Sequence, residues 1–254
     1  MDYIVASVDE ALNLLVLVSE HPRLGVSELA RRSSNTKARA YRLLSSLEGR
    51  GFVERVGDPA VYRLGHKALL VGFAAQKQID LVSLAGPHLS KLGETFNETV
   101  HVRVRDGLES VCIALWESNR DVRVSSSVGK RRPLHAGSSG KILLAFGSED
   151  IREAILSSEL ERFTPNTIVQ RGRLAQELGK VRSQGYALSN AEVAQDIRSV
   201  AAPVRDARGL AIASLGMSIP AMRANDAEMQ RVAAAVVATA AGLSKDLGWT
   251  GQAA

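Results

Sequence analysis

The stretch that most constrains the fold runs from residue 26 to residue 62. It reads VSELARRSSNTKARAYRLLSSLEGRGFVERVGDPAVY, which predicts a helix, a short turn, a second helix and two short strands. In the second helix, apolar residues recur with helical spacing at Ala40, Leu43, Leu44 and Leu47, so this side is expected to be buried. Two strands that follow a helix-turn-helix make a winged helix-turn-helix, a DNA-binding motif.

The charge of this stretch is uneven. The chain of 254 residues carries a formal charge of +5, which permits contact with a polyanion without requiring it. Between residues 31 and 47, however, five residues are basic and none is acidic. Such a local concentration of basic residues is typical of a DNA-binding surface. The alternative is that these charges only form a solvated helix face.

The exposed side of the second helix predicts how DNA is contacted. Arginine in the major groove reads guanine O6 and N7 with two parallel hydrogen bonds, so Arg39 and Arg42 are expected to read bases. Basic residues around the turn are expected to hold phosphates, which supply affinity and salt dependence. Phosphate contacts are assigned to Arg31, Arg32 and Lys37, wing contacts to Arg55 and Arg63, and further contacts to Thr36, Ala38, Tyr41 and Ser45.

Composition narrows the class of protein. With 45% hydrophobic residues the chain is able to bury a substantial core. Cys112 is the single cysteine, so there is no internal disulfide and a reducing compartment is expected. The first residues lack the pattern of a signal peptide, and no stretch approaches the roughly 18 apolar residues of a membrane span. We expect a cytoplasmic protein without cofactor or metal, because the five histidines have no metal-ligand spacing.

Helix and strand signals continue along the chain. An amphipathic helix is expected over 7–20, Ser27 is expected to cap the second helix, and Thr36 the third. Pro87 is expected to kink or break the helix that contains it. Further helices are expected over 66–78, 80–96, 140–146, 149–157, 171–184 and 225–247, and strands over 52–55, 61–64, 98–105, 108–116, 122–128, 197–205 and 210–218.

Four runs of sequence resemble the IclR family of bacterial transcriptional regulators. They are SELARRSSNTKARAYRLLSSLEGRGFVER, PLHAGSSGKILLAF at 133–146, GYALSNAEVAQDIRSVAAPVRD at 185–206 and GLAIASLGMSIPAMR at 209–223. The resemblance spans about residues 5–247. It implies an α/β (α+β) fold: a winged helix-turn-helix domain over 1–65, a linker and dimerisation helix over 66–79, and a GAF-like effector domain with an antiparallel sheet flanked by helices over 80–249.

The resemblance also implies a function. We expect a homodimer or tetramer that binds a pseudo-palindromic double-stranded operator and controls a catabolic operon in response to a small organic acid, aromatic acids included. Compared with the family pattern, Thr36 replaces a common proline, and Ala38 and Arg39 replace small hydroxyl residues. These departures predict a different operator sequence. The linker helix has one alternative role, which is packing against the chain's own wing.

Effector contacts are expected at small polar positions. The Gly/Ser loop at 137–140 opens a helix, and free amides at a helix start favour an anion. Arg103 is expected to meet an effector acid, or else to lie exposed at the surface. The pocket is expected to be less acidic than in many relatives, which favours a carboxylate. Following the resemblance and the strand pattern, the predicted contacts are His101, Arg103, Val124, Ser138, Ser139, Ser189, Asn190, Ser199, Gly216 and Ser218.

Two rival functions remain open. Ser138 and Lys141 have the Ser-x-x-Lys spacing of some serine acyl enzymes, in which the lysine activates the hydroxyl. The Ser-Asp-Asn and Lys-Thr-Gly motifs that accompany it are missing, so we assign no catalytic residue. The second rival is a metabolite sensor without DNA function.

Overall fold

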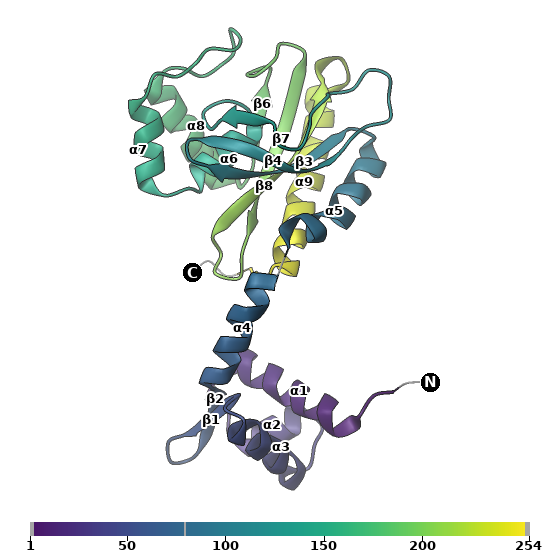
Figure 1. The fold of residues 1–254 in the computed structure, drawn as a ribbon, viewed down its shortest axis with the longest axis vertical. Coiled ribbons are helices and arrows are strands. Elements are labelled where there is room, and N and C mark those ends of the chain that lie inside the picture. The colour runs from purple at the N-terminus through teal and green to yellow at the C-terminus, as the bar shows by residue number, and fades with distance from the viewer. Residues whose placement is uncertain (1–2, 79, 252–254) are drawn as a thin grey trace. The chain divides into compact units, whose positions relative to one another are not determined.

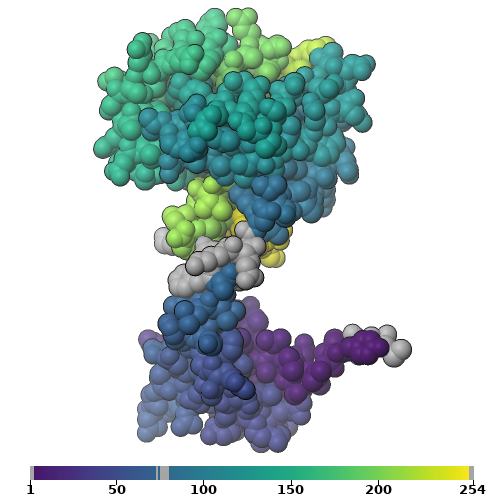
Figure 2. Space-filling view, viewed as in Figure 1, coloured from purple at the N-terminus to yellow at the C-terminus, as the bar shows by residue number. Residues whose placement is uncertain are grey.

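Figure 1 shows the fold in a computed structural model that describes residues 3–78 and 80–251. The chain divides into two compact units, Met1–Ile79 and Asp80–Ala254. Figure 2 shows the same units in space-filling form, the first in purple to blue and the second in blue to yellow. Among the described residues, no helix is both long and apolar enough to cross a bilayer.

The N-terminal unit is a winged helix-turn-helix followed by a further helix, as the sequence predicted for residues 26–62. Its core is formed by apolar side chains from the first three helices and the two strands, including Leu14, Leu29, Leu44 and Tyr62. The elements are α1 (Ala6–Glu20), α2 (Val26–Arg32), α3 (Lys37–Gly49), the antiparallel pair β1 (Val53–Val56) and β2 (Val61–Leu64), and α4 (His66–Gln78).

The caps of α2 and α3 differ in kind. Thr36 caps α3 as predicted, because its hydroxyl accepts a hydrogen bond from the amide of Arg39 at 3.2 Å. The prediction that Ser27 caps α2 was wrong: the cap is Gly25, whose carbonyl accepts from the amide of Leu29 at 3.1 Å. The first turn of α2 therefore closes on the backbone, without a side-chain cap.

Helix α4 presents an apolar surface. Leu69, Leu70 and Val71 are about half exposed, so the wing of the same chain leaves about half of their surface uncovered. The side chain of Phe73, a further apolar residue of this helix, lies outside the described part of the structure. An apolar surface of this kind is typical of a subunit interface.

The C-terminal unit is built on a six-stranded antiparallel sheet of order β5-β4-β3-β8-β7-β6. Helices α5 and α9 cover one face, while α6 packs on the other and is itself covered by α7 and α8, as Figure 1 shows. The strands are β3 (Thr99–Asp106), β4 (Glu109–Trp116), β5 (Arg131–Pro133), β6 (Ala187–Asn190), β7 (Ile197–Arg205) and β8 (Ala211–Pro220). The helices are α5 (Leu81–Phe96), α6 (Ser138–Ala145), α7 (Glu149–Ser157), α8 (Arg171–Gln184), the short 3-10 helix η1 (Ala221–Arg223) and α9 (Asp226–Asp246).

Strand alternation divides the side chains between these two layers. Val100 and Val102 of β3 point into the core under α5 and α9, so their neighbour His101 faces the α6 side. Adjacent strands repeat this pattern: Val200 belongs to the first layer, and Ala201 packs with α6 and α8. The α6 face of the sheet thus collects the polar positions that the sequence predicted as effector contacts.

Three sequence predictions differ from the structure in this unit. Residues 122–128 are not a strand; their carbonyls are bound by side chains, Val124 O by Thr99 Oγ1 at 2.7 Å and Val122 O by Arg223 Nη2 at 2.9 Å. The sheet gains β6 and the edge strand β5 instead, which were not predicted. Helix α5 runs through Pro87 without a break, since Ala85 and Leu89 on either side are held in the core.

Candidate DNA-binding surface and ligand cavity

The exposed side of α3 carries the residues predicted to contact DNA. Thr36, Lys37, Ala38, Tyr41 and Arg42 are exposed. Their positions follow from the buried side of the same helix, where Ala40 and Leu44 are completely enclosed in the core. Two further predicted contacts on α3, Arg39 and Ser45, are half-buried.

Most of the predicted arginines are already paired with carboxylates of the same unit. Arg39 Nε forms an ion pair with Glu10 of α1. Arg31 and Arg32 both bind Glu28, at 2.6 and 2.8 Å, and these hydrogen bonds lower the pKa of that carboxyl to about 2. On the wing, Arg63 binds Glu54 at 2.7 Å, and Arg55 is exposed opposite Tyr62.

Lys37 and Arg42 differ from these arginines. Both are exposed, and within the described residues neither side chain has a hydrogen bond or an ion pair. Arg42 lies one helical turn after Ala38 on the side that faces away from the core. These two cations are therefore available to a ligand outside the unit without the loss of an intramolecular contact.

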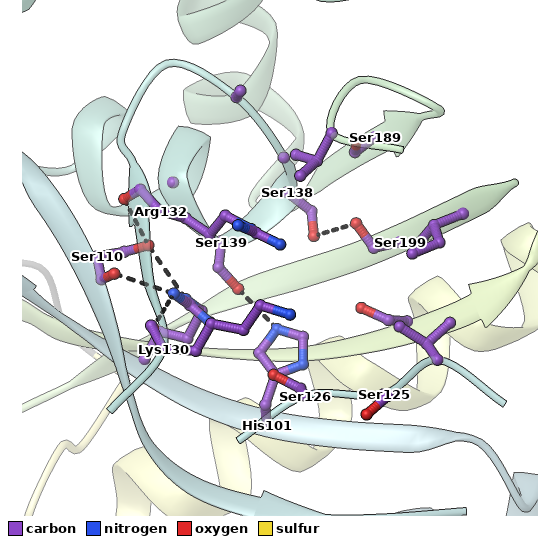
Figure 3. A pocket seen from close by; sticks show the side chains of 18 residues that line it. His101, Ser110, Ser125, Ser126, Lys130, Arg132, Ser138, Ser139, Ser189 and Ser199 are labelled. Carbon is purple, nitrogen blue, oxygen red and sulfur yellow. Dashed lines mark hydrogen bonds between the residues drawn. The ribbon is translucent and has the colours of Figure 1, made fainter. Parts of the chain in front are cut away.

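A cavity of about 120 Å³ opens on the α6 face of the sheet. Eight of the ten predicted effector contacts line it, together with residues of the loop before α6 and of the segment between β4 and β5 (Figure 3). The eight are His101, Arg103, Val124, Ser138, Ser139, Ser189, Ser199 and Ser218.

The remaining two predicted contacts lie elsewhere. Gly216 lies beneath the cavity: a methyl group at this position would approach His101 Nε2 to 2.9 Å and Ser139 Oγ to 3.1 Å, so glycine lets these two side chains approach the sheet. Asn190 was predicted wrongly as a lining residue. It is exposed and follows Ser189 in β6, so strand alternation turns its side chain away from the cavity.

Side-chain hydrogen bonds arrange the serine side of the cavity. Ser138 Oγ donates to Ser199 Oγ at 2.8 Å, which ties α6 to β7. His101 Nε2 lies 3.1 Å from Ser139 Oγ. Burial, and to a lesser degree the charge of Arg103, lower the pKa of His101 to about 3, so the ring is neutral at physiological pH. It therefore adds a hydrogen-bonding group to the cavity, and no charge.

Arg103 is buried and in the cavity, so the alternative of an exposed surface residue was wrong. Its Nε donates to Ser110 Oγ at 3.1 Å, and its Nη2 donates to the carbonyls of Ser110 at 2.9 Å and Lys130 at 2.6 Å. These acceptors are neutral, so its charge is not compensated by them. Burial lowers the pKa of Arg103.

Two more cations line the cavity that the sequence analysis did not select. Lys130 directly precedes β5, and Arg132 lies within it, one on each side of Arg131. Burial, followed by repulsion from Arg132 and Arg103, lowers the pKa of Lys130. The sequence did contain a signal for these two residues. A run of basic residues precedes the Gly/Ser loop, and alternate residues of a strand point to the same face of the sheet. Other lining residues missed by the prediction are Ser110, Ser125, Ser126, Val193 and Ile197.

The residues of the possible acyl enzyme do not meet. The Lys141 ammonium group donates to Glu192 Oε1 at 2.6 Å, Glu177 Oε1 at 2.8 Å and the carbonyl of Leu188 at 2.5 Å. All three ammonium donors are thus used. Ser138 is bound to Ser199 instead, so the lysine does not activate the serine hydroxyl.

Comparison with known proteins assigns both units to the same protein family. The family described as "IclR helix-turn-helix domain" matches residues 7–57, and "Bacterial transcriptional regulator IclR C-terminal" matches residues 73–245. The chain is 31% identical over 246 residues to the HTH-type transcriptional regulator KdgR of Dickeya chrysanthemi, covering 96% of this chain and 81% of the relative.

Two further relatives extend the comparison. The HTH-type transcriptional regulator XynR of Escherichia coli is 32% identical over 248 residues, which cover 97% of this chain and 98% of the relative. The crystal structure of the repressor BlcR of Agobacterium tumefaciens aligns with a TM-score of 0.82 at 25% identity, over 96% of this chain and 98% of that chain. These relatives are transcriptional regulators and not enzymes. A winged helix-turn-helix, a ligand cavity on a six-stranded sheet and full-length similarity lead to one conclusion: the chain belongs to the IclR family of bacterial transcriptional regulators, which bind DNA and carry a ligand-binding C-terminal domain.

Proposed function

We propose that α3 reads the operator, with Arg42 as the principal base-reading side chain and Lys37 as a phosphate contact. The observation that carries this proposal is that both cations are exposed and free of partners in the described chain. Arg42 has the reach for a bidentate contact with guanine. Arg39 reads a base only if its ion pair with Glu10 opens, so its first role is to hold α3 against α1.

The paired arginines fit the backbone of DNA better than the bases. Arg31, Arg32 and Arg63 each have a carboxylate partner at the protein surface. A phosphate is able to replace such a partner, because exposed ion pairs are worth only about 0–1 kcal/mol. These residues therefore supply affinity and salt dependence.

We propose further that the cavity binds a small organic acid. Three cations line it, and no acidic residue is among its described lining residues. The amides at the start of α6 add partial positive charge on the same cavity. An anion is thus favoured, whereas a cationic metabolite is repelled.

The ligand acts by a shift between arrangements of subunits. It changes operator affinity only if it binds two arrangements unequally. A second copy of the chain is supported by the exposed apolar side chains Val8, Leu12 and Val16 of α1 and by those of α4. A dimer or tetramer of this kind reads a pseudo-palindromic operator, and its place in the cell is then the nucleoid.

A gel shift on the protein's own upstream DNA tests both the operator proposal and the ligand proposal. Retention that weakens with salt, and that changes when short organic acids are added, is the expected result. Absence of salt-dependent retention contradicts the operator proposal. Normal retention without response to any acid contradicts the ligand proposal alone.

A further inference from the structure

The cationic side chains of the cavity have no carboxylate partner in the described part of the chain. The adjacent residue Arg131, in contrast, has two. Arg131 lies between Lys130 and Arg132 but points to the other side, where it binds Asp106 at 2.6 Å and Glu109 at 2.7 Å. Within the described residues, the side chains of Lys130 and Arg132 have no hydrogen bond or ion pair. The same strand thus pairs its outward cation with two carboxylates and leaves its cavity-facing cations with none.

These cations form one wall, which we call the cationic wall: Arg103, Lys130 and Arg132 with Ser110. Arg103 is fixed by three hydrogen bonds to neutral acceptors, one of them the carbonyl of Lys130 itself. The remaining nitrogen, Nη1, has no partner in the described residues. Like charges in one buried place repel, and this repulsion contributes to the lowered pKa of Lys130. An anion on this wall removes the repulsion.

The opposite wall also favours an anion, for a different reason. Helix α6 begins at Ser138, and the amides of Ser138, Ser139 and Gly140 have no acceptor within the described chain. Ser189 also lines the cavity, is only 4% exposed and has no side-chain partner among the described residues. Free amides together with a buried free hydroxyl form a second group of donors, which we call the α6 wall.

The two walls are separate. Figure 3 shows Ser110, Lys130 and Arg132 on one side of the cavity and Ser138, Ser189 and Ser199 on the other, with Ser139 and His101 between them. A single carboxylate supplies one negative charge, whereas the cationic wall alone carries three cationic side chains. The cavity volume is only about 120 Å³, so the molecule that reaches both walls is small.

We propose that this cavity binds a short aliphatic dianion, with one acidic group on the α6 wall and the second on the cationic wall. The inference rests on the proposed ligand function and narrows it. Apart from His101, no ring side chain lines the cavity in the described residues, so an aromatic acid has no stacking surface beyond that one ring. The second acidic group is an oxyanion, either a carboxylate or a phosphonate-like group.

Calorimetric titration of the full chain with three matched probes tests this inference. Butyrate and succinate have four carbons and differ in the second carboxylate, and 3-phosphonopropionate carries a phosphorus oxyanion instead. Succinate is expected to bind at least about tenfold more tightly than butyrate, because its second carboxylate adds hydrogen bonds with charged groups. The stronger of the two dianions identifies the kind of second group.

Two variants at adjacent positions test which side chain causes the preference for succinate. Arg132→Gln should reduce the preference for succinate over butyrate to near one, whereas Arg131→Gln, the matched control, should leave it unchanged. Lys130→Gln repeats the test if Arg132→Gln does not fold. Since Arg132 is uncompensated in the free protein, its removal should also raise the melting temperature, whereas removal of Arg131 should lower it.

The results of these titrations distinguish the dianion inference from the proposed ligand function. Equal binding of butyrate and succinate, or an unchanged preference in Arg132→Gln, overturns the dianion inference while the ligand function stands. If none of the three probes binds and no acid alters DNA retention, both the inference and the proposed ligand function are wrong.

Discussion

Replacement of Lys141 by alanine should destabilise the C-terminal unit more than any surface change. Lys141 is 1% exposed and its ammonium group is the charged partner of Glu192, which is 5% exposed. Removal of the lysine leaves this carboxylate buried without a cation, a change that costs about 3–5 kcal/mol. The second partner, Glu177, has a quarter of its side chain exposed and can turn to water, so it adds little to the loss.

Urea unfolding followed by tryptophan fluorescence measures this effect. Both tryptophans, Trp116 and Trp249, belong to the C-terminal unit, so the signal reports on this unit within the full chain. With a slope of about 2 kcal/mol per molar urea, the midpoint should fall by roughly 1.5–2.5 M. A fall that corresponds to less than about 1 kcal/mol would refute the assignment of Lys141 as the buried ion-pair partner that Glu192 needs in the fold.

Two control variants sharpen the test. Lys180→Ala makes the same change on the exposed side of α8, and it should alter stability by no more than about 0.5 kcal/mol. Lys141→Met combined with Glu192→Gln removes both charges, so it should recover part of the loss. Glu192 also accepts a hydrogen bond from the amide of Gly137 at 3.1 Å. Because Gly137 lines the cavity, Lys141→Ala should also weaken binding of the acid.

Three further predictions concern DNA, ligand and pH. Arg42→Ala should reduce binding to the operator strongly, by about 1–3 kcal/mol, and Lys37→Ala should mainly lower the salt slope; equal losses on operator and random DNA for Arg42→Ala would exclude base reading. Ser199→Trp should fill the cavity, so a gel shift should show normal DNA retention and no response to acid, and a normal response would remove Ser199 from the site. Acidification should destabilise the C-terminal unit: the pKa of His101 is about 3 in the fold against 6.5 as its ordinary value, so between these values the unfolded chain binds the extra proton. Stability should therefore fall by up to about 1.4 kcal/mol per pH unit below pH 6.5, measured by urea unfolding, and His101→Gln should remove most of this slope.

Local sequence signals were sufficient where one short stretch determines the structure. Thr36 was predicted as a cap and is one, because capping involves only the next three residues. The buried side of α3 followed from helical spacing in the same way. Ser138, Ser139 and Ser199 were assigned to the ligand site through the family resemblance, and the structure brings them together in one cavity.

Contacts between residues far apart in the chain could not be predicted from the sequence. The ion pair between Arg39 and Glu10 joins residues 29 positions apart, so Arg39 was predicted to have the same role as Arg42. Lys130 and Arg132 were overlooked since nothing local shows that β5 lies beside β4 at the edge of the cavity. Residues 122–128 alternate like a strand, but their carbonyls are taken by Thr99 and Arg223.

The irregular segment 122–128 gives the cavity walls of unequal stiffness. The α6 side is fixed through Lys141 and Glu192, whereas the wall that contains Val124, Ser125 and Ser126 has no strand ladder to hold it. Substitutions in this segment change the shape of the cavity without breaking a sheet or a buried charge pair. A change of ligand specificity is therefore expected to cost little stability when it is made in this wall, and more when it is made in the α6 wall.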